Sequence, residues 1–274
     1  MAPIDALPAA RWQYDPNQPH LSAYATALSN ETVTPDLTSS LTTIGEHQRR
    51  LRAQRRRGLL LVLHGLDASG KDSLIRVLAR YMDPAAFHAW SFGRPIGTET
   101  QHDFLWRITP WLPAYGDVAA FNRGHHEVVI AERAWPVHTA DHYDWPTRYA
   151  ALRHFEAHLA QEGTRILKFW LHLSQEEHRQ RLLKRLDRPH KRWKFDAADI
   201  DAWDRRSELL GYVEDALTAT HIPEAPWFVI PADHKPTARA VVAAIVAQEL
   251  ETLAPDYPTA DDQILTSYRE RLTE

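Results

Sequence analysis

Residues 58–75 read GLLLVLHGLDASGKDSLI and constrain the fold more than any other stretch. The apolar run at 59–63 is too short and too continuous for an amphipathic helix, so it predicts a strand buried on both faces. The next residues have the spacing of a phosphate-binding loop, in which backbone N–H groups converge on phosphate oxygens at a helix N-terminus. We expect Lys71 to reach the terminal phosphates and the cradle to be formed by Gly65, Ala68, Ser69 and Gly70. A simple glycine turn would not require strand, loop, lysine and helix to follow in this order.

Two acids in this loop point to metal chemistry. Asp72 stands where most such loops have the Ser or Thr that ligates magnesium, and Asp67 lies inside the loop. Because carboxylates repel bare phosphate, the pair indicates metal ions held between the acids and a polyphosphate chain. Two alternatives remain: Asp67 as the N-cap of the loop helix, and Asp72 as a complement to the helix dipole.

Composition bounds the class of protein. A chain of 274 residues without an evident linker favours one large α/β domain. The absence of cysteine excludes disulfides, thiolate metal sites and a cysteine nucleophile. No segment has the pattern of a secretory signal, and no apolar run approaches the roughly 20 residues that span a bilayer. We therefore expect a soluble cytoplasmic protein.

Charge is unevenly distributed. The net charge of −4, from 32 basic and 36 acidic residues, gives no overall field that would attract nucleic acid. One basic cluster nevertheless precedes the first strand, and a second runs from Arg179 through Lys194. Either cluster alone would be read as a solvated helix face. Together with a phosphate-binding loop they point to a long polyanion, and the first cluster comprises Arg49, Arg50, Arg52, Arg55, Arg56 and Arg57.

The remaining pattern predicts a five-stranded parallel sheet with helices between the strands. Strands are expected at 59–63, 87–92, 117–121, 165–173 and 227–230, and helices at 36–51, 71–81, 99–109, 145–161, 175–186, 200–220 and up to 250. The carboxyl ends of parallel strands face one crevice, so the loops at Gly65–Lys71, Gly93–Arg94 and Asn122–Arg123 should converge there.

The domain layout follows from the same pattern. We expect an N-terminal arm at 1–35, one domain built around the phosphate-binding loop at 36–253 and a polar C-terminal tail at 254–274. Within the domain, the basic segment at about 187–199 interrupts helical periodicity and is typical of a lid that closes over phosphates.

Several motifs together resemble the polyphosphate kinase 2 family. They are GLDASGKD, the FLWR of 104–107, the FNR–HE pattern of 121–127, GTRILKFWLHLSQEE at 163–177, RWKF at 192–195 and APWFVIPADHK at 225–235. The resemblance implies a three-layer α/β fold similar to thymidylate kinase with a helical lid. It also implies Mg²⁺, with Mn²⁺ as an alternative, a homodimer or homotetramer, and reversible phosphoryl transfer between inorganic polyphosphate and a nucleotide.

The acceptor is implied by the FNR form. Asn122, where other members have Asp, resembles the branch that accepts nucleoside monophosphates as well as diphosphates, so AMP and ADP are expected and guanine nucleotides are left open. The chain departs from that branch at Gly124, His126 and Val128, and at Pro236 after Lys235. Val128 removes the second of two adjacent acids, which predicts that ADP is the better acceptor.

Site roles follow from the chemistry of phosphoryl transfer, which needs alignment, metal bridging and positive charge. Asp67 is the best metal ligand, with Asp72 and Glu127 as further metal candidates; Glu127 is otherwise an acceptor-side acid or an exposed helix residue. Arg123 and Arg133 are expected to clamp phosphate through their guanidinium forks. Further substrate contacts are expected from Asn122, from Arg181, Arg185 and Lys194 on the lid side, and from Arg55, Arg56 and Arg57. Asp233 and Lys235 are placed to contact the base or a phosphate.

Two other functions compete with a polyphosphate-dependent nucleotide phosphotransferase. An ATP-dependent nucleotide kinase on the same fold would not need both an acidic loop and two basic tracts. A non-catalytic polyphosphate-binding subunit would not need the metal acids. The histidines His125, His126, His138 and His142 do not form a zinc motif, because no cysteine or suitably placed acid completes one.

Overall fold

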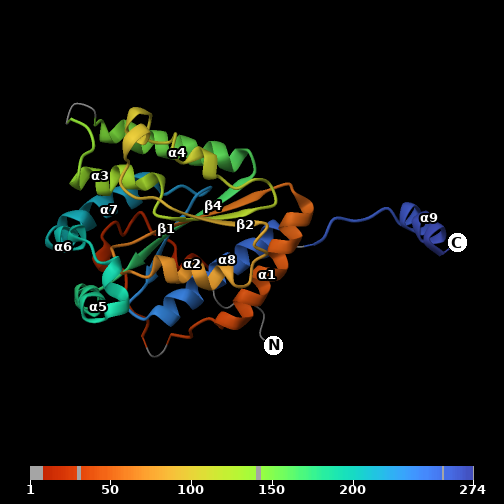
Figure 1. Cartoon of the computed structure of the whole chain (residues 1–274), viewed down its shortest axis with the longest axis horizontal. Helices are drawn as coiled ribbons and strands as arrows, with labels where there is room; N and C mark the ends of the chain where they lie inside the picture. The colour runs from red at the N-terminus through yellow and green to blue at the C-terminus, as the bar shows by residue number, and fades with distance from the viewer. Residues whose placement is uncertain (1–8, 30–31, 140–142, 255, 274) are drawn as a thin grey trace.

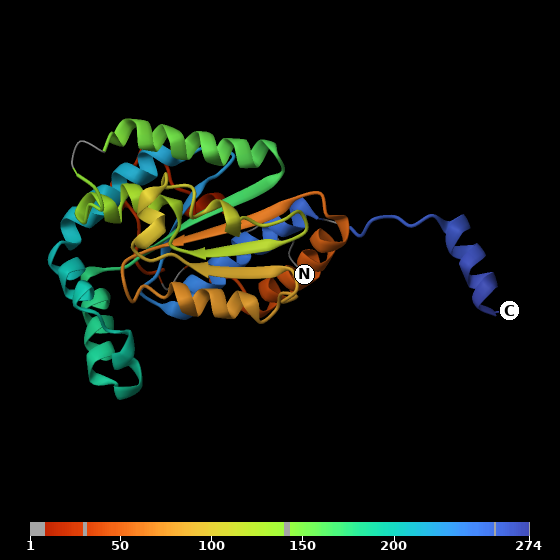
Figure 2. The same ribbon diagram turned by 45° about the horizontal axis from the view of Figure 1, so that its top comes forward.

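A parallel five-stranded sheet forms the centre of the computed structural model, which describes residues 9–29, 32–139, 143–254 and 256–273. The strand order is β2-β3-β1-β4-β5, and helices cover both faces (Figures 1 and 2). This confirms the α/β class and the five-stranded parallel sheet. The strands are β1 (Gly58–His64), β2 (Phe87–Ser91), β3 (Val118–Asn122), β4 (Thr164–His172) and β5 (Trp227–Pro231).

The apolar run at 59–63 lies in the central strand, β1. β1 pairs with β3 on one side and β4 on the other, so that Leu61 lies beside both Ala120 and Leu167. All seven of its residues are buried, as expected for a strand covered on both faces. Its carboxyl end therefore opens at the middle of the sheet, where the order of the strands reverses direction and ligands of such sheets bind.

Two helical layers enclose the sheet (Figure 1). One layer consists of α1 (Leu37–Gln54), α2 (Lys71–Ala79) and α8 (Lys235–Leu253), whose apolar side chains share one core cluster. The other contains α3 (Ala131–Ala134), α4 (Trp145–Gln161) and α7 (Arg206–Thr220). Caps set the starts of two of these helices: Asp36 accepts a hydrogen bond from the Thr38 amide, and Asp144 from the Thr147 amide.

The predicted helix at 99–109 is wrong. The structure has a 3₁₀ helix, η4 (Gly97–Gln101), then turns, then η5 (Thr109–Trp111). Asp103 explains part of the difference, because its carboxylate accepts from the Leu105 amide at 2.9 Å and so competes with a helical backbone bond. Pro110 further disfavours a regular helix at the far end.

The predicted lid at 187–199 connects two α-helices and contains a 3₁₀ helix. α5 (Gln175–Asp187) starts at Ser174, whose hydroxyl accepts from the Glu177 amide, and leads into the 3₁₀ helix η8 (Pro189–Lys194). α6 (Ala197–Asp204) then follows, and a break at Arg205 separates it from α7, so the single helix expected at 200–220 is two helices.

The ends of the chain differ in how they pack. Residues 9–29, with the 3₁₀ helices η2 (Ala9–Trp12) and η3 (Leu21–Ala23), lie against the outer edge of β5, where the Tyr14 amide donates to the Trp227 carbonyl at 2.8 Å. α9 (Asp262–Thr273) instead projects away from the body and has no buried residue (Figure 2). Within the described part of the chain, no helix combines the length and the apolar character needed to cross a bilayer.

Candidate active site

The loop between β1 and α2 has the conformation its glycines predict. Gly65 has a φ of +153°, and a Cβ at this position would lie only 2.7 Å from the Ser69 hydroxyl. Gly70 has a φ of +115° and is the N-cap of α2. Both positions therefore require glycine, and the loop can bring its backbone close to a ligand.

Lys71 lies inside this loop rather than on a solvated helix. Its ammonium donates to the carbonyl of Gly65 at 2.6 Å and to that of Leu66 at 3.2 Å. Burial, together with the nearby Arg123 cation, lowers the pKa of Lys71 to about 8. The charge of Lys71 is therefore poorly solvated, and a phosphate oxygen binds a poorly solvated cation strongly.

Asp67 and Arg123 connect the loop to the next strand. Arg123 follows β3 in a left-handed conformation, with a φ of 66°, and its guanidinium donates to the Asp67 carboxylate at 2.7 Å. The Arg123 and Lys71 cations hold the pKa of Asp67 below its usual value even though burial opposes this. The predicted convergence of the loops after β1 and β3 is therefore present in the structure.

The second loop acid, Asp72, lies between β3 and η8. The Asn122 amide donates to one of its oxygens at 2.5 Å, and the Lys194 ammonium lies 3.2 Å from the other. Asp72 thus joins three predicted site segments.

Glu127 extends from the 3₁₀ helix η6 (His125–Val129) that follows β3. Its carboxylate lies 3.0 Å from the His64 ring, and the His64 hydrogen bond and the Arg123 cation lower its pKa against the effect of burial. Both Arg123 and Lys71 act electrostatically on Glu127, so it belongs to the same cluster as Asp67.

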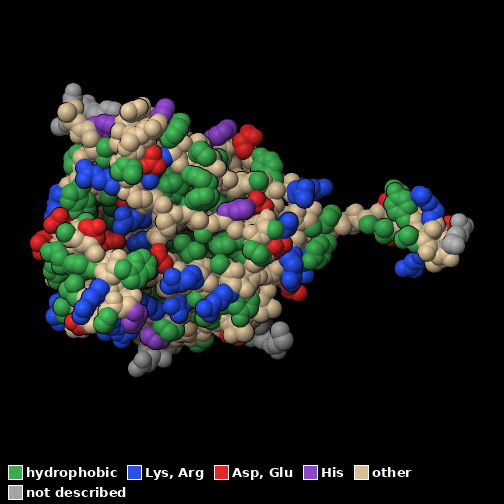
Figure 3. All heavy atoms as spheres, viewed as in Figure 1, with side chains coloured by type: hydrophobic (Ala, Val, Ile, Leu, Met, Phe, Trp, Pro, Cys, Tyr) green, Lys and Arg blue, Asp and Glu red, His purple; other side chains and the backbone are tan. Residues whose placement is uncertain are grey.

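Cations gather on the lid side of the loop. Arg181 donates to the carbonyls of Ser69 at 2.7 Å and Ala232 at 2.6 Å, and so ties the loop to the end of β5. Lys235 lies beside Gly70, and burial and the neighbouring cations Arg181, Lys191 and Arg239 lower its pKa to about 8. Figure 3 shows Lys and Arg side chains gathered over the region of α2 and α5.

Five arginines predicted to contact substrate lie away from the phosphate-binding loop or are held by other partners. Arg185 donates to Asp199 at 2.7 Å and holds α5 to α6 within the segment predicted to be a lid. Arg133 donates to Tyr149 at 2.9 Å and to Asp215 at 2.7 Å, so it contacts α4 and α7 rather than the phosphate-binding loop. Arg55, Arg56 and Arg57 are exposed at the amino end of β1, and the seven-residue strand separates them from the loop by roughly 20 Å.

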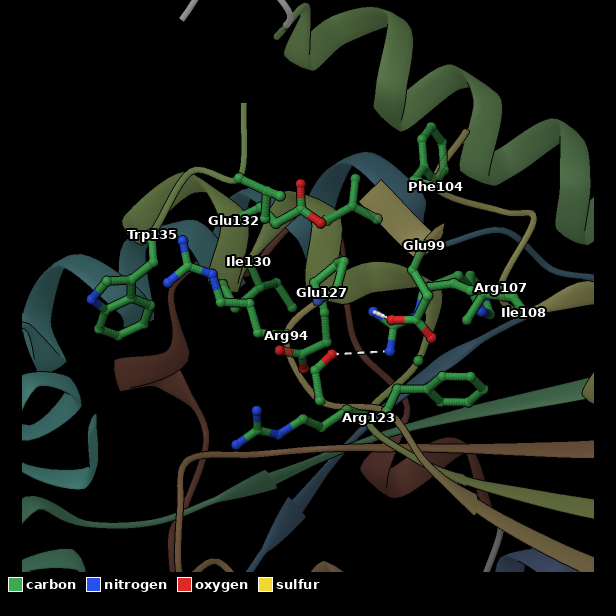
Figure 4. A pocket seen from close by; sticks show the side chains of 18 of the residues that line it. Arg94, Glu99, Phe104, Arg107, Ile108, Arg123, Glu127, Ile130, Glu132 and Trp135 are labelled. Carbon is green, nitrogen blue, oxygen red and sulfur yellow. Dashed lines mark hydrogen bonds and ion pairs between the residues drawn. The ribbon is translucent and has the colours of Figure 1, made fainter. Parts of the chain in front are cut away.

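On the other side of the loop, a cavity of about 780 Å³ opens beyond Asp67 and Glu127. In Figure 4, Arg123 forms its lower wall, while Phe104 and Glu132 lie at its upper side. Arg94, Arg107 and Trp135 also line it. The volume lies within the range of pockets that bind small molecules and cofactors.

A family model for polyphosphate kinase 2 matches residues 27–258, which include both sides of this loop. The chain belongs to the polyphosphate kinase 2 family. It is 38% identical over 225 residues to an ADP-polyphosphate phosphotransferase of Rhodopseudomonas palustris, covering 78% of each chain. It is 41% identical over 224 residues to an AMP/ADP-polyphosphate phosphotransferase of Meiothermus ruber, covering 80% of this chain and 82% of the relative.

A solved member of the family has the same fold. The crystal structure of polyphosphate kinase 2 from Arthrobacter aurescens superimposes with a TM-score of 0.89 at 29% identity, covering 97% of each chain. These relatives do not assign the chain to the branch predicted from Asn122, which stays a prediction.

The acids of the site fit a divalent ion that also binds substrate. Magnesium is typically held by one or two carboxylates and completed by waters and phosphate oxygens. Asp67, Asp72 and Glu127 supply carboxylates around Lys71, and each acts on its charge. These three carboxylates do not bring their oxygens together as a preformed metal site. Among the described residues, the one group with three possible ligand atoms close together is His125, His126 and Glu156.

Sequence reasoning missed two features of this site. Arg239 is one helical turn after Lys235 at the start of α8. Two cations with this spacing after the end of a strand indicate that both lie on the same face of the helix, near the site. His64 was hidden inside an apolar run, although it is the one polar side chain in β1.

Proposed function

We propose that this protein transfers a phosphoryl group between inorganic polyphosphate and ADP or AMP. The observation that supports this most directly is the position of Lys71. It lies between a cavity of nucleotide size and a cluster of cations that faces the other side of the loop. The names of the relatives from R. palustris and M. ruber agree with this pair of substrates.

The donor chain would lie along the cationic side. Burial, and then the neighbouring cations Arg181, Lys191 and Arg239, lower the pKa of Lys235, and gathering these like charges is costly unless a polyanion binds there. Arg181 holds the loop carbonyls that border this side. A single nucleotide triphosphate would not need so many cations, and this favours polyphosphate over ATP as the phosphoryl donor.

The acceptor nucleotide would occupy the cavity, with its terminal phosphate at Asp67, Arg123 and Glu127. Phe104 and Trp135 offer apolar ring faces for the base farther from the loop. Val128 is 4% exposed and lines the cavity next to Glu127, so the acceptor side has one carboxylate rather than two adjacent ones. We infer that ADP, whose β-phosphate extends closer to the loop, is the preferred acceptor.

Asp67 and Glu127, with Asp72 as a further ligand, would hold Mg²⁺, for which Mn²⁺ is the alternative. The ion, when bound, supplies positive charge shared between the phosphate groups of donor and acceptor. Lys71 and Arg123 would bind the oxygens of the transferred group and align it with the acceptor. An acceptor phosphate oxygen forms the new bond to phosphorus, the bridging P–O bond of the chain breaks, and the shortened chain leaves with the negative charge.

One incubation tests the proposal. Purified protein with magnesium, ADP or AMP, and polyphosphate of defined length should yield ATP or ADP on anion-exchange separation, together with shortened chains. Replacing polyphosphate with ATP and supplying AMP tests for an ordinary nucleotide kinase. No product from polyphosphate in either direction would contradict the proposal.

We also propose that the protein forms a homodimer or homotetramer. Light scattering of the same sample tests this.

A further inference from the structure

A line of buried polar side chains runs inward from Glu127. The His64 ring lies 3.0 Å from Glu127 and meets the His126 ring edge-on, with centroids 5.5 Å apart. His126 in turn lies 3.2 Å from Glu156, whose other oxygen accepts from Lys168 at 2.6 Å. His64, His126, Glu156 and Lys168 are all at most 1% exposed. The line thus joins the candidate site to β4 through the centre of the fold.

The inner part of this line is not a metal site. His125, His126 and Glu156 place ligand atoms within 4.8 Å of one another. However, the Lys168 ammonium already contacts Glu156 and also donates to the Thr220 carbonyl at 2.7 Å. A divalent ion would lie beside this buried cation and be strongly repelled, because charges interact strongly in a weakly polar interior. Glu156 is paired with Lys168 and fixes the position of the two histidines.

The outer part of the line is oriented toward the site. His64 is the last residue of β1, and its backbone is held by pairing with Trp170 of β4. Glu127 instead extends from a five-residue 3₁₀ helix, a type of element with weaker hydrogen bonding than an α-helix. A carboxylate only accepts hydrogen bonds, so the His64 Nδ1 must be the donor. His64 Nε2 has no hydrogen-bond partner among the described residues, so Glu127 is the one hydrogen-bond partner of the ring there.

We propose that His64 is a positioning residue that holds the Glu127 carboxylate toward Lys71, Arg123 and the acceptor cavity. The inference rests on the proposed function, in which Glu127 faces the acceptor phosphate. Without His64, a flexible glutamate side chain on a short element could rotate into a 780 Å³ cavity. His64 then acts only through Glu127 and does not contact substrate.

The test compares three replacements of one side chain. The amide nitrogen of His64→Asn lies near the place of Nδ1 and can donate to Glu127, whereas that of His64→Gln lies near Nε2 and cannot. His64→Leu removes the donor entirely. We expect His64→Gln and His64→Leu to lower kcat for ADP phosphorylation about 10- to 100-fold, the range for a hydrogen bond to a charged group, with the KM for polyphosphate within about twofold. His64→Asn should recover most of kcat.

Two controls separate positioning from stability. His221→Leu removes a half-buried histidine that accepts from the Trp227 amide and has no contact with Glu127, so it should lower the Tm without lowering kcat. Glu127→Gln should lower kcat. Adding His64→Leu to Glu127→Gln should lower kcat no further, since both changes disrupt the same His64–Glu127 hydrogen bond.

Opposite results overturn the proposal. Equal kcat for His64→Asn and His64→Gln would show that the donor position does not matter. An additive loss in the double variant would show that His64 acts independently of Glu127. Should His64→Leu not fold, the Asn and Gln pair still decides. Wild-type protein without polyphosphate-dependent activity would instead reject the proposed function, and a fully active Glu127→Gln would reject the role of Glu127.

Discussion

The guanidinium of Arg123 donates to the carboxylate of Asp67 across 2.7 Å and joins the end of β3 to the phosphate-binding loop. The pair holds an acid against the region where a polyanion is expected to bind, with Lys71 as the second cation nearby. Asp67 is thus positioned before any metal arrives.

Asp67→Asn should therefore abolish phosphoryl transfer while the protein stays folded. Loss of one preorganised stabilising group typically lowers the rate at least about a hundredfold. The measurement is kcat for ADP phosphorylation over a magnesium titration, with Tm on the same sample. Asp83→Asn is the matched control. Asp83 also pairs with an arginine, Arg52, at 2.5 Å, but this pair lies outside the site. Near-normal turnover in Asp67→Asn would eliminate Asp67 as a metal ligand.

Lys71 gives the reaction an alkaline limit. Its pKa of about 8 means that the free enzyme loses this cation as the pH rises, so kcat/KM for polyphosphate should fall above pH 8. The unfolded chain binds the same proton more tightly, so this group by itself makes stability rise between about pH 8 and 10.5. Activity and stability should therefore change in opposite directions there.

Lys71→Met, which keeps the length of the side chain, should abolish transfer at every pH. Lys235 has a similar pKa, and Lys235→Arg separates the two, because arginine stays charged throughout this range. If the alkaline fall disappears in Lys235→Arg, Lys235 rather than Lys71 sets it.

The cation cluster should control polyphosphate binding. Lys235→Ala and Arg239→Ala should each raise the KM for polyphosphate and weaken its salt dependence, because each removes a phosphate contact that releases counterions. The KM for ADP should not change.

The combined Ala variant of Arg55, Arg56 and Arg57 is the control for charge. These side chains lie at the opposite end of β1, so short chains should bind as in the wild type, and weaker binding should appear only with long chains. An equal effect on short and long chains would contradict their placement outside the site.

Val128→Asp should raise kcat/KM for AMP relative to ADP, because it restores a second acid beside Glu127. The new carboxylate would replace a side chain packed among Leu66, Val129 and other apolar residues, so we also expect a lower Tm. Both acceptors are measured on the same preparation, with Val128→Asn as the uncharged control. An unchanged AMP/ADP ratio, or a wild type that prefers AMP, would refute the acceptor argument.

Acid should destabilise the protein through His172. Burial and the nearby Arg206 cation lower the pKa of His172 to about 4, so the unfolded chain binds its proton more tightly. This contribution is fully present above the ordinary pKa of 6.5 and is lost as the pH falls toward 4, at a cost of about 3 kcal/mol. His172→Asn keeps an acceptor for the Trp170 indole and should flatten the decrease in urea-derived stability over this interval.

The sequence predicted those parts of the molecule in which local pattern and tertiary environment agree. The run at 59–63 is buried on both faces, and the loop lysine follows it at the required spacing, so both were readable. The helix predicted at 99–109 is wrong because the Asp103 carboxylate and Pro110 interrupt a spacing of apolar residues that by itself indicates a helix.

The contacts within the site were harder to predict from the sequence, because the residues that make them are distant along the chain. His64 and Glu127 are 63 positions apart, and Arg181 meets Ser69 across 112. Arg133 shows the converse: a guanidinium is chemically suited to phosphate, yet Asp215 and Tyr149 bind it in the fold. Residue type indicates what a side chain can bind, and only the topology decides what it meets.

The contact of residues 9–29 with β5 also orders events while the chain is being made. Tyr14 bonds through its hydroxyl to Thr218, 204 positions later, and through its amide to Trp227. Because synthesis proceeds from the N-terminus, this segment must wait until almost the whole domain has left the ribosome before it can pack. Until then Trp12 and Tyr14 have no sheet to cover them, so a segment made before the rest of the domain is among the last to reach its final place.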